Sequence, residues 1–487
     1  MRNFKLLCFL RRIFILIPCI FMALLTQPSE SADFSTYCQY PPYVFQSKLP
    51  SVMLLVSNSY SMSGFAYQNK TSDTEANASD GFIPGHRYYG LFDPDYWYNS
   101  SWQKTATKTS SAKPSATSWH GSFLNWLTMR RIDVVNKLLT GGIDVGSNSS
   151  GYQSCGNDNT RYKKYVDDGI YSGTDKSGNT IYAFFDHKTN CTGKNTSGLE
   201  LYSYVGATKT SLGTKSVVGD PPTGNGLIQR NLPKAQIGLA FYNEKGDGAN
   251  ITVPTKSAWG SSDWNKLKTP SQYNNEADQP LADALFSIAG YFAQVPNSDS
   301  LVNTTTLGNC TSSSPCGPDY GGSGFASRST SSDPYYQHGA LSQCTKGNVI
   351  ILTDGEPCSD GNLPSRLAHF ADNTLFHCDG TTCPAAPGFL ASAGPPACIS
   401  RSGVSQTGRE KGSLEDVALW AHTTDLRNDI PNSSGKQALD IWIVRAFGFS
   451  KSNLLQYAGI NGSFDTAIDN VPKVGNFDPE QGYFEAD

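Results

Sequence analysis

Short apolar runs, separated by long polar stretches, predict strands and helices in alternation along the chain. Val52–Val56 lies between Pro50 and small hydroxylated residues, and residues 348–353 form a second run that ends in an acidic turn. Runs with apolar residues at successive positions, bounded by turn residues, are typical of strands buried on both faces of a parallel sheet. The same reasoning predicts strands at residues 235–242, 438–449 and 482–486.

Helical periodicity separates these strands. Apolar residues recur at helical spacing over residues 122–140, where Gly141 can end the helix, and again from Pro280, which suits a first helical turn. Residues 413–416 have the form of a capping box, so a helix is expected over 414–427, and a short one over 454–458. Such alternation predicts an α/β fold with an open, mostly parallel sheet and helices on both faces.

Four polar stretches lie between the predicted elements. We interpret them as surface insertions, at residues 64–120, 143–232, 294–343 and 358–411, in one domain spanning residues 51–487 after an N-terminal lead at 32–50. The first insertion holds an aromatic cluster, residues 88–98. A structured loop that packs these rings on the core is favoured over a contact surface, because glycine and proline punctuate the cluster.

The N-terminus has the pattern of a targeting segment. Basic residues precede an apolar run, residues 13–25, which is short for a membrane span and is followed by small residues. We expect residues 1–31 to be a signal peptide, cleaved near Ser31, with an uncleaved signal anchor as the alternative. The mature protein is therefore expected to be exported.

Cysteine usage agrees with export. Of the twelve cysteines, ten lie outside the signal peptide, and an even number in an exported chain favours disulfides. Proximity alone suggests three pairs: Cys155 with Cys191, Cys310 with Cys316, and Cys378 with Cys383. His377, Cys378 and Cys383 could instead supply half of a zinc site, but a disulfide is favoured in an exported, cysteine-rich insertion.

Composition and missing motifs exclude several function classes. The chain has 487 residues and a formal net charge of −4, so no basic surface favours nucleic acid as a partner. The sequence contains no C-x-x-C-H haem motif, P-loop, G-x-S-x-G elbow or H-E-x-x-H helix. We therefore expect neither haem nor nucleotide as a cofactor, and no enzymatic activity.

Polar residues follow two of the predicted strands. Ser57, Ser59 and Ser61 come directly after Val56, and Asp354 follows the strand at 348–353. Ligands of open α/β sheets bind outside the carboxyl ends of the strands, so these side chains are expected to form one polar site.

This order of elements, with serines after the first strand and Thr-Asp-Gly after a later one, resembles a von Willebrand factor type A domain. The resemblance implies a metal-ion-dependent adhesion site that holds Mg²⁺, with Ser59, Ser61 and Asp354 as its residues here. Ser57 replaces the expected first aspartate and Gln279 the expected threonine. Two hydroxyls and one carboxylate would hold Mg²⁺ only weakly. The alternative is that the serines hydrogen-bond the turn backbone.

Several longer stretches are similar to the PilY family. They are residues 89–94 (YGLFDP), 123–142 (FLNWLTMRRIDVVNKLLTGG), 352–357 (LTDGEP) and 416–426 (DVALWAHTTDL). The resemblance implies an exported protein of a type IV pilus system, found in the periplasm, on the outer-membrane surface or at the pilus tip. It implies roles in pilus assembly and surface adhesion, with minor pilins or the pilus fibre as partners and a surface or host ligand that the sequence does not identify. The alternative is a secreted A-domain adhesive module unrelated to pili.

The sequence given stops at Asp487, directly after the last predicted strand. The resemblance leads us to expect a further helix and a large β-propeller, often with a calcium loop, beyond this point. The chain is therefore interpreted as a fragment, as a short member of the family, or as one half of an assembly in which a second chain supplies the missing part.

Overall fold

A computed structural model describes the residues that build the central sheet, its helices and a set of smaller sheets. The described residues are 48–59, 62, 66–67, 83, 85–99, 103–108, 118–129, 131–141, 163–167, 180–185, 199–205, 208–215, 226–242, 248–268, 279–294, 332–342, 345–355, 357, 360, 363, 367, 369–378, 413–427, 430, 436–447, 452–467, 469, 471–473 and 482–486.

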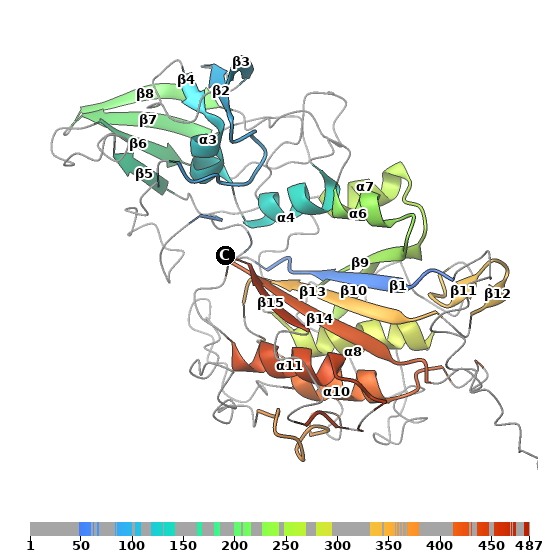
Figure 1. Cartoon of the computed structure of the whole chain (residues 1–487). Coiled ribbons are helices and arrows are strands. Elements are labelled where there is room, and N and C mark those ends of the chain that lie inside the picture. The colour runs from blue at the N-terminus through green and yellow to red at the C-terminus, as the bar shows by residue number, and fades with distance from the viewer. Residues whose placement is uncertain are drawn as a thin grey trace, which may run out of the picture.

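A six-stranded sheet forms the centre of the molecule (Figure 1). Its order is β10-β9-β1-β13-β14-β15, with every neighbouring pair parallel except β10 with β9. The strands are β1 (Ser51–Val56), β9 (Gln236–Tyr242), β10 (Ala249–Lys256), β13 (Gly347–Thr353), β14 (Leu439–Ala446) and β15 (Tyr483–Ala486). The prediction of a mostly parallel sheet is confirmed, and five of these strands lie where the apolar runs predict them.

Strand β1 illustrates why the apolar runs were informative. Met53 and Leu55 pack into the core on one face of the sheet, whereas Leu54 and Val56 pack into the core on the other. Because successive side chains of a strand point to opposite faces, a strand covered on both sides must be apolar at every position. The centre of the sheet is therefore buried on both faces.

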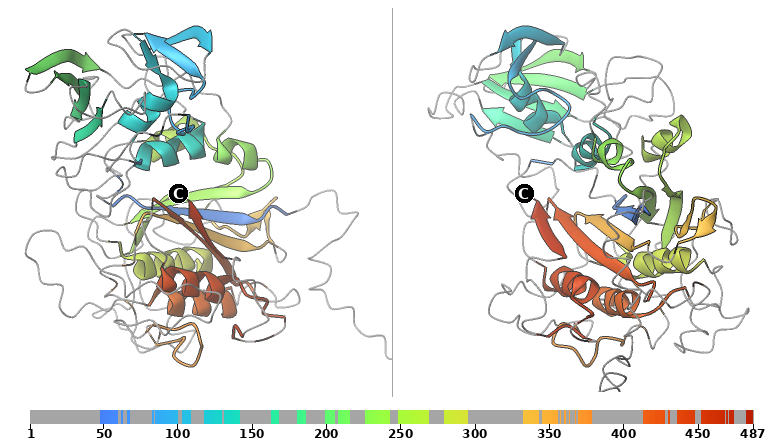
Figure 2. Two further views of the ribbon diagram at one scale, coloured as in Figure 1. Left: turned by 60° about the vertical axis from the view of Figure 1, so that its left-hand side comes forward. Right: turned by 45° about the vertical axis from the view of Figure 1, so that its right-hand side comes forward.

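Helices cover the two faces of the sheet (Figures 1 and 2). One face carries α8 (Leu281–Ala293), α10 (Leu414–Thr423) and α11 (Asn453–Ser463). The other carries α4 (Arg131–Thr140), α6 (Leu227–Asn231) and α7 (Ser261–Lys268). Helices on both faces agree with the prediction. Within the described part of the chain, no helix is long and apolar enough to cross a membrane.

Three helices differ in length from the prediction. The segment 122–140 forms two helices, α3 (Gly121–Thr128) and α4, because the chain becomes extended at Met129. Thr128 Oγ1 donates to the carbonyl oxygen of Leu124, a contact that weakens and bends helix ends. Helix α10 ends at Thr423 rather than 427, and α11 runs beyond residue 458 to Ser463.

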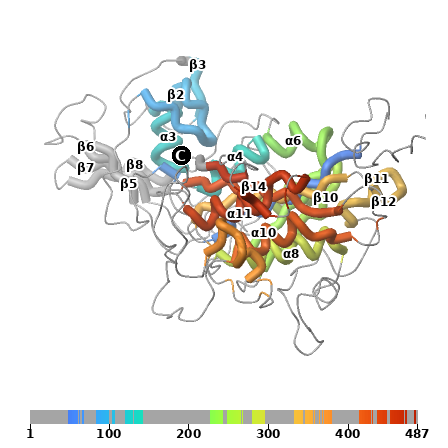
Figure 3. Tube along the Cα trace, turned by 60° about the horizontal axis from the view of Figure 1, so that its bottom comes forward, coloured from blue at the N-terminus to red at the C-terminus, as the bar shows by residue number. Residues whose placement is uncertain are grey.

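The polar insertions hold strands that periodicity did not reveal. A three-stranded sheet orders β3 (Lys104–Lys108), β2 (Tyr96–Asn99) and β4 (Ser118–His120). A four-stranded antiparallel sheet joins β5 (Lys163–Asp167), β6 (Thr180–Phe185), β7 (Leu199–Val205) and β8 (Thr208–Lys215). A short hairpin pairs β11 (Tyr336–Gln337) with β12 (Ala340–Leu341). Figure 3 shows β2, β3 and α3 together, well apart from β11 and β12.

Candidate functional site

The predicted polar site forms at the carboxyl ends of β1 and β13. These neighbouring strands mark the point where the strand order reverses, since the chain continues from β1 to β9 on one side and reaches β13 on the other. Ser57 and Ser59 each donate a hydroxyl hydrogen bond of 3.2 Å to Asp354 Oδ1. The two serine Oγ atoms lie 3.0 Å apart. All three residues are buried, whereas Ser61 lies outside the described residues.

Gln279 extends this cluster from the start of α8. Its Nε2 donates to Asp354 Oδ1 at 3.2 Å and to Ser59 Oγ at 3.3 Å. Its Oε1 accepts from Thr353 Oγ1 at 3.3 Å. A Cβ atom at Gly355 would lie 2.6 Å from Gln279 Nε2, so a larger residue there would displace the Gln279 amide from its present position. Gln279 thus replaces the expected threonine with a longer donor that reaches the carboxylate.

Arg131, the first residue of α4, completes the cluster. Its Nη1 lies 3.1 Å from Asp354 Oδ2, and the two side chains are only 4% and 0% exposed. A buried carboxylate needs a cation or several hydrogen-bond donors near it. Asp354 has both, because Arg131 contacts Oδ2 while neutral donors form hydrogen bonds to Oδ1.

The described residues do not fit a Mg²⁺ ion at this position. Mg²⁺ requires several oxygen ligands with free lone pairs, usually including carboxylates. Here Asp354 is the carboxylate of the cluster, its oxygens already accept four hydrogen bonds, and a guanidinium supplies the positive charge. Magnesium binding remains a prediction, and the contacts of Asp354 argue against it. The sequence did not predict a role for Arg131, although two adjacent arginines inside the apolar pattern of residues 122–140 could have indicated a buried ion pair.

Asn125 holds the loop at residues 88–92 against α3. Its fully buried amide donates to the carbonyl oxygens of Tyr88 and Phe92 at 2.8 and 2.7 Å, and its Oδ1 accepts from the Phe92 amide at 2.9 Å. A Cβ atom at Gly90 would lie 2.5 Å from Asn125 Oδ1, so this loop requires glycine. The rings of Phe92 and Tyr98 pack edge to face inside it. Most of the aromatic cluster is buried, as the structured-loop interpretation predicts.

The cysteine predictions are largely untested. Cys378 is disulfide-bonded, and the other cysteines all lie outside the described residues. The suggested pairs of Cys155 with Cys191, Cys310 with Cys316, and Cys378 with Cys383 therefore stay predictions. Since Cys378 is in a disulfide, it is not a zinc ligand.

The fold defines an open α/β protein with a buried polar cluster at the switch point of its sheet. Residues 79–215 match the family model described as the small alpha/beta domain of PilY1 homologs. This match supports the membership of the chain in the PilY family. No curated protein and no solved structure matches the chain.

The matched domain contains β2 to β8, α3 and α4. It begins within the first expected insertion and ends within the second. Two of the stretches that resemble the PilY family, residues 89–94 and 123–142, lie inside it.

Proposed function

We propose that this protein is a type IV pilus-associated protein that acts in pilus assembly and surface adhesion at the pilus tip. The observation that carries the proposal is the family match over residues 79–215. It coincides with two of the four sequence stretches that resemble the PilY family. The proposed role is that of a binding protein, without catalytic activity.

The contacts between the family-like stretches support the proposal. Asn125, from the stretch 123–142, holds the stretch 89–94 in place through backbone hydrogen bonds. Arg131, from the same stretch, binds Asp354 in the stretch 352–357. Separate stretches that share a resemblance thus make one connected unit.

The strand order supports a von Willebrand factor A-like main domain as part of the proposal. The order β10-β9-β1-β13-β14-β15, with an antiparallel edge at β10, places the ends of β1 and β13 side by side. A secreted adhesive module with no link to pili would use the same sheet edge. The pilus proposal also includes export to the periplasm or the outer-membrane surface, and contact with minor pilins.

Fractionation of pili tests the proposal. The tagged full chain is produced in its own host, pili are sheared from the cells, and the sheared fraction is blotted in wild-type cells and in cells that lack the major pilin. We expect the chain in the sheared fraction of wild-type cells and its loss without pilin. A free protein whose amount in the medium does not depend on pilin would contradict the pilus role and favour the secreted module.

Two matched variants then show which part contacts the fibre. Tyr89, in the matched domain, is 46% exposed, and Leu341, in the β11–β12 hairpin, is 38% exposed. Tyr89→Ser is expected to lower recovery of the chain in sheared pili, whereas Leu341→Ser leaves recovery unchanged. Equal recovery of both variants would remove the Tyr89 side of the small domain as the contact surface.

A further inference from the structure

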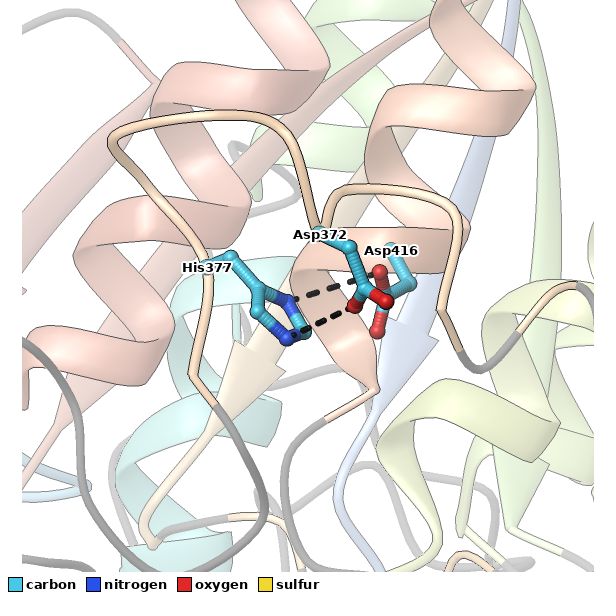
Figure 4. Close-up of side chains that lie close together, drawn as sticks. All are labelled: Asp372, His377 and Asp416. Atoms are coloured by element: carbon cyan, nitrogen blue, oxygen red, sulfur yellow. Dashed lines mark ion pairs between the residues drawn. The ribbon is translucent and has the colours of Figure 1, made fainter.

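A second group of ionisable side chains gathers beside the first turn of α10. Asp372 and His377 come from the turn segment 369–378, and Asp416 comes from the helix. One potential ligand atom from each lies within 4.8 Å of the other two. Figure 4 shows the imidazole edge facing both carboxylates, with His377 Nε2 at 3.0 Å from Asp372 Oδ1 and Nδ1 at 3.6 Å from Asp416 Oδ1.

Glu415 adds a second buried carboxylate to this group. Its Oε1 lies 3.4 Å from His377 Nδ1 and accepts the Cys378 amide at 2.7 Å. Asp416 Oδ1 accepts the amide of Ala371 at 2.5 Å. Both side chains are fully buried. The main chain of the turn thus fixes one oxygen of each carboxylate.

The other oxygens of these two carboxylates lack a hydrogen-bond partner among the described residues. They are Glu415 Oε2 and Asp416 Oδ2, both inaccessible to solvent. Burial, and then the charge of Glu415, raise the pKa of Asp416 to about 8. The contact with Glu415, and then the charge of Asp416, raise the pKa of His377. These raised pKa values reflect burial and the gathering of three carboxylates, Asp372, Glu415 and Asp416, around one imidazole, where a cation would favour the ionised carboxylates.

We propose that Asp372, His377 and Asp416 bind a divalent transition-metal ion of the Zn²⁺ type. In this arrangement His377 Nε2 and one oxygen of each aspartate face the ion. Zinc holds imidazole and carboxylate ligands at about 2.0–2.2 Å, so neighbouring ligand atoms lie roughly 3–3.6 Å apart, and Nε2 lies 3.0 Å from Asp372 Oδ1. Asp416 Oδ1 lies 3.6 Å from the other ring nitrogen, Nδ1, and one potential ligand atom of each residue lies within 4.8 Å of the other two. His377 Nδ1 has no hydrogen-bond partner among the described residues, and Glu415 Oε1 lies 3.4 Å from it, so Glu415 is the carboxylate that would orient a metal-bound imidazole.

The ligand chemistry selects the class of ion. Ca²⁺ and Mg²⁺ prefer sites built entirely of oxygen atoms, whereas an imidazole nitrogen with carboxylates suits Zn²⁺ and its transition-metal neighbours. An ion can enter from solvent, since the Asp372 side chain is 47% exposed and His377 16% exposed. Imidazole and carboxylate ligands must be deprotonated to hold an ion, so zinc binding is expected to weaken in acid.

Zinc titration of the purified full chain, with its disulfides oxidised and metal removed by a chelator, tests the site. We expect one Zn²⁺ per chain by calorimetry and a zinc-dependent rise in the melting midpoint. His377→Asn and Asp416→Asn should each weaken binding by at least about tenfold. His338→Asn is the matched control, because His338 is an exposed histidine in a turn whose positive φ suits asparagine.

Each result bears on the proposal. Failure of the wild-type chain to bind zinc would overturn it. Wild-type affinity in both His377→Asn and Asp416→Asn would overturn it too, since it would show that the zinc is held elsewhere on the chain. Should one variant fail to fold, the other still decides, because each removes a different ligand. Loss of affinity in both, with normal binding by His338→Asn, supports the site.

Discussion

Two buried carboxylates of this protein, Asp354 and Asp416, have opposite surroundings. Asp354 accepts hydrogen bonds from Arg131 and from three neutral donors, so both of its oxygens are satisfied. Asp416 lies beside Glu415, a second carboxylate, and its Oδ2 has no hydrogen-bond partner among the described residues. A partly buried imidazole, that of His377, lies 3.6 Å from the other oxygen of Asp416, Oδ1.

This difference indicates which of the two carboxylates is available to bind a ligand. A carboxylate that the protein itself neutralises stabilises one arrangement of the chain and leaves little to offer a ligand. A pair of buried carboxylates with unmet oxygens destabilises the metal-free fold and gains from any cation that enters. The site that the strand pattern predicts is thus a structural junction between α4 and the sheet. The site beside α10 is the better candidate for a ligand.

Removal of Arg131 should have the largest effect. Arg131→Met leaves Asp354 as a buried charge without its cation, which costs about 3–5 kcal/mol in the free energy of unfolding. Denaturant unfolding followed by tryptophan fluorescence measures this loss. Arg131→Met combined with Asp354→Asn should recover part of it, because the double variant buries no lone charge.

The control is an exposed ion pair. Arg87 Nη2 lies 2.9 Å from Asp95 Oδ2, with the side chains 68% and 42% exposed. Arg87→Met should change stability by less than about 1 kcal/mol, since solvent and salt screen exposed pairs. If Arg131→Met proves as mild as Arg87→Met, the junction assigned to Asp354 is wrong.

The stability of the metal-free protein should fall as pH rises. Folding raises the pKa of Asp416 from 3.8 to about 8, so its contribution to stability is complete below about pH 4 and is lost as the pH rises through 8. The raised pKa of His377 acts in the same direction above its ordinary value of 6.5. The expected loss is up to about 1.4 kcal/mol per pH unit for each proton concerned.

Asp416→Asn should flatten this dependence by about one proton, which denaturant melts at a series of pH values would measure in the presence of a chelator. Asp95→Asn, which removes an exposed carboxylate, serves as the control and should keep the wild-type slope. An unchanged slope in Asp416→Asn would show that Asp416 is not held protonated by the fold. Saturating zinc should also reduce the wild-type slope, since the ion takes the place of the protons.

The central sheet could be predicted from the sequence because its strands are buried on both faces. Uninterrupted apolar runs such as Val52–Val56 leave little doubt about strand position. Strand β10 was missed, because Pro254 interrupts it and proline is tolerated only at a sheet edge, where β10 lies. The strands β2 to β8 were missed for a different reason: they are short segments inside stretches that the polar composition marked as surface insertions, although β6 and β7 are themselves rich in apolar and aromatic residues.

The two sites differ in how many of their residues could be predicted from the sequence. Ser57, Ser59 and Asp354 could be placed together because parallel strand ends share one edge of a sheet. Arg131 could not, because it reaches Asp354 from 223 residues away through the packing of α4. The sequence indicated His377 only as part of a possible zinc site with Cys378 and Cys383. Its approach to Asp416 depends on how the turn at 369–378 folds against α10, which no local pattern encodes.

Gln279→Thr should have a smaller effect than Arg131→Met. The change restores the residue that the A-domain resemblance implies but removes the Nε2 donor to Asp354 Oδ1 and Ser59 Oγ. A neutral hydrogen bond contributes about 1 kcal/mol, and Asp354 keeps Arg131 and both serines. Urea melts of Gln279→Thr and Gln279→Glu compare loss of a donor with a new repulsive charge. A larger loss for the threonine variant than for Arg131→Met would reverse the assigned order of importance.

Magnesium should have the smallest effect on the protein. Four donors already surround Asp354, so millimolar Mg²⁺ is expected to leave the melting midpoint unchanged in wild type and in Asp354→Ala. The informative comparison is with a triple variant that combines Ser57→Asp, Gln279→Thr and Arg131→Met. It places two carboxylates together without a guanidinium, so it should be unstable alone and gain stability from Mg²⁺. A magnesium-dependent midpoint in wild type that disappears in Asp354→Ala would instead establish the adhesion-type metal site, and with it the accessibility of Asp354 to ligands despite Arg131.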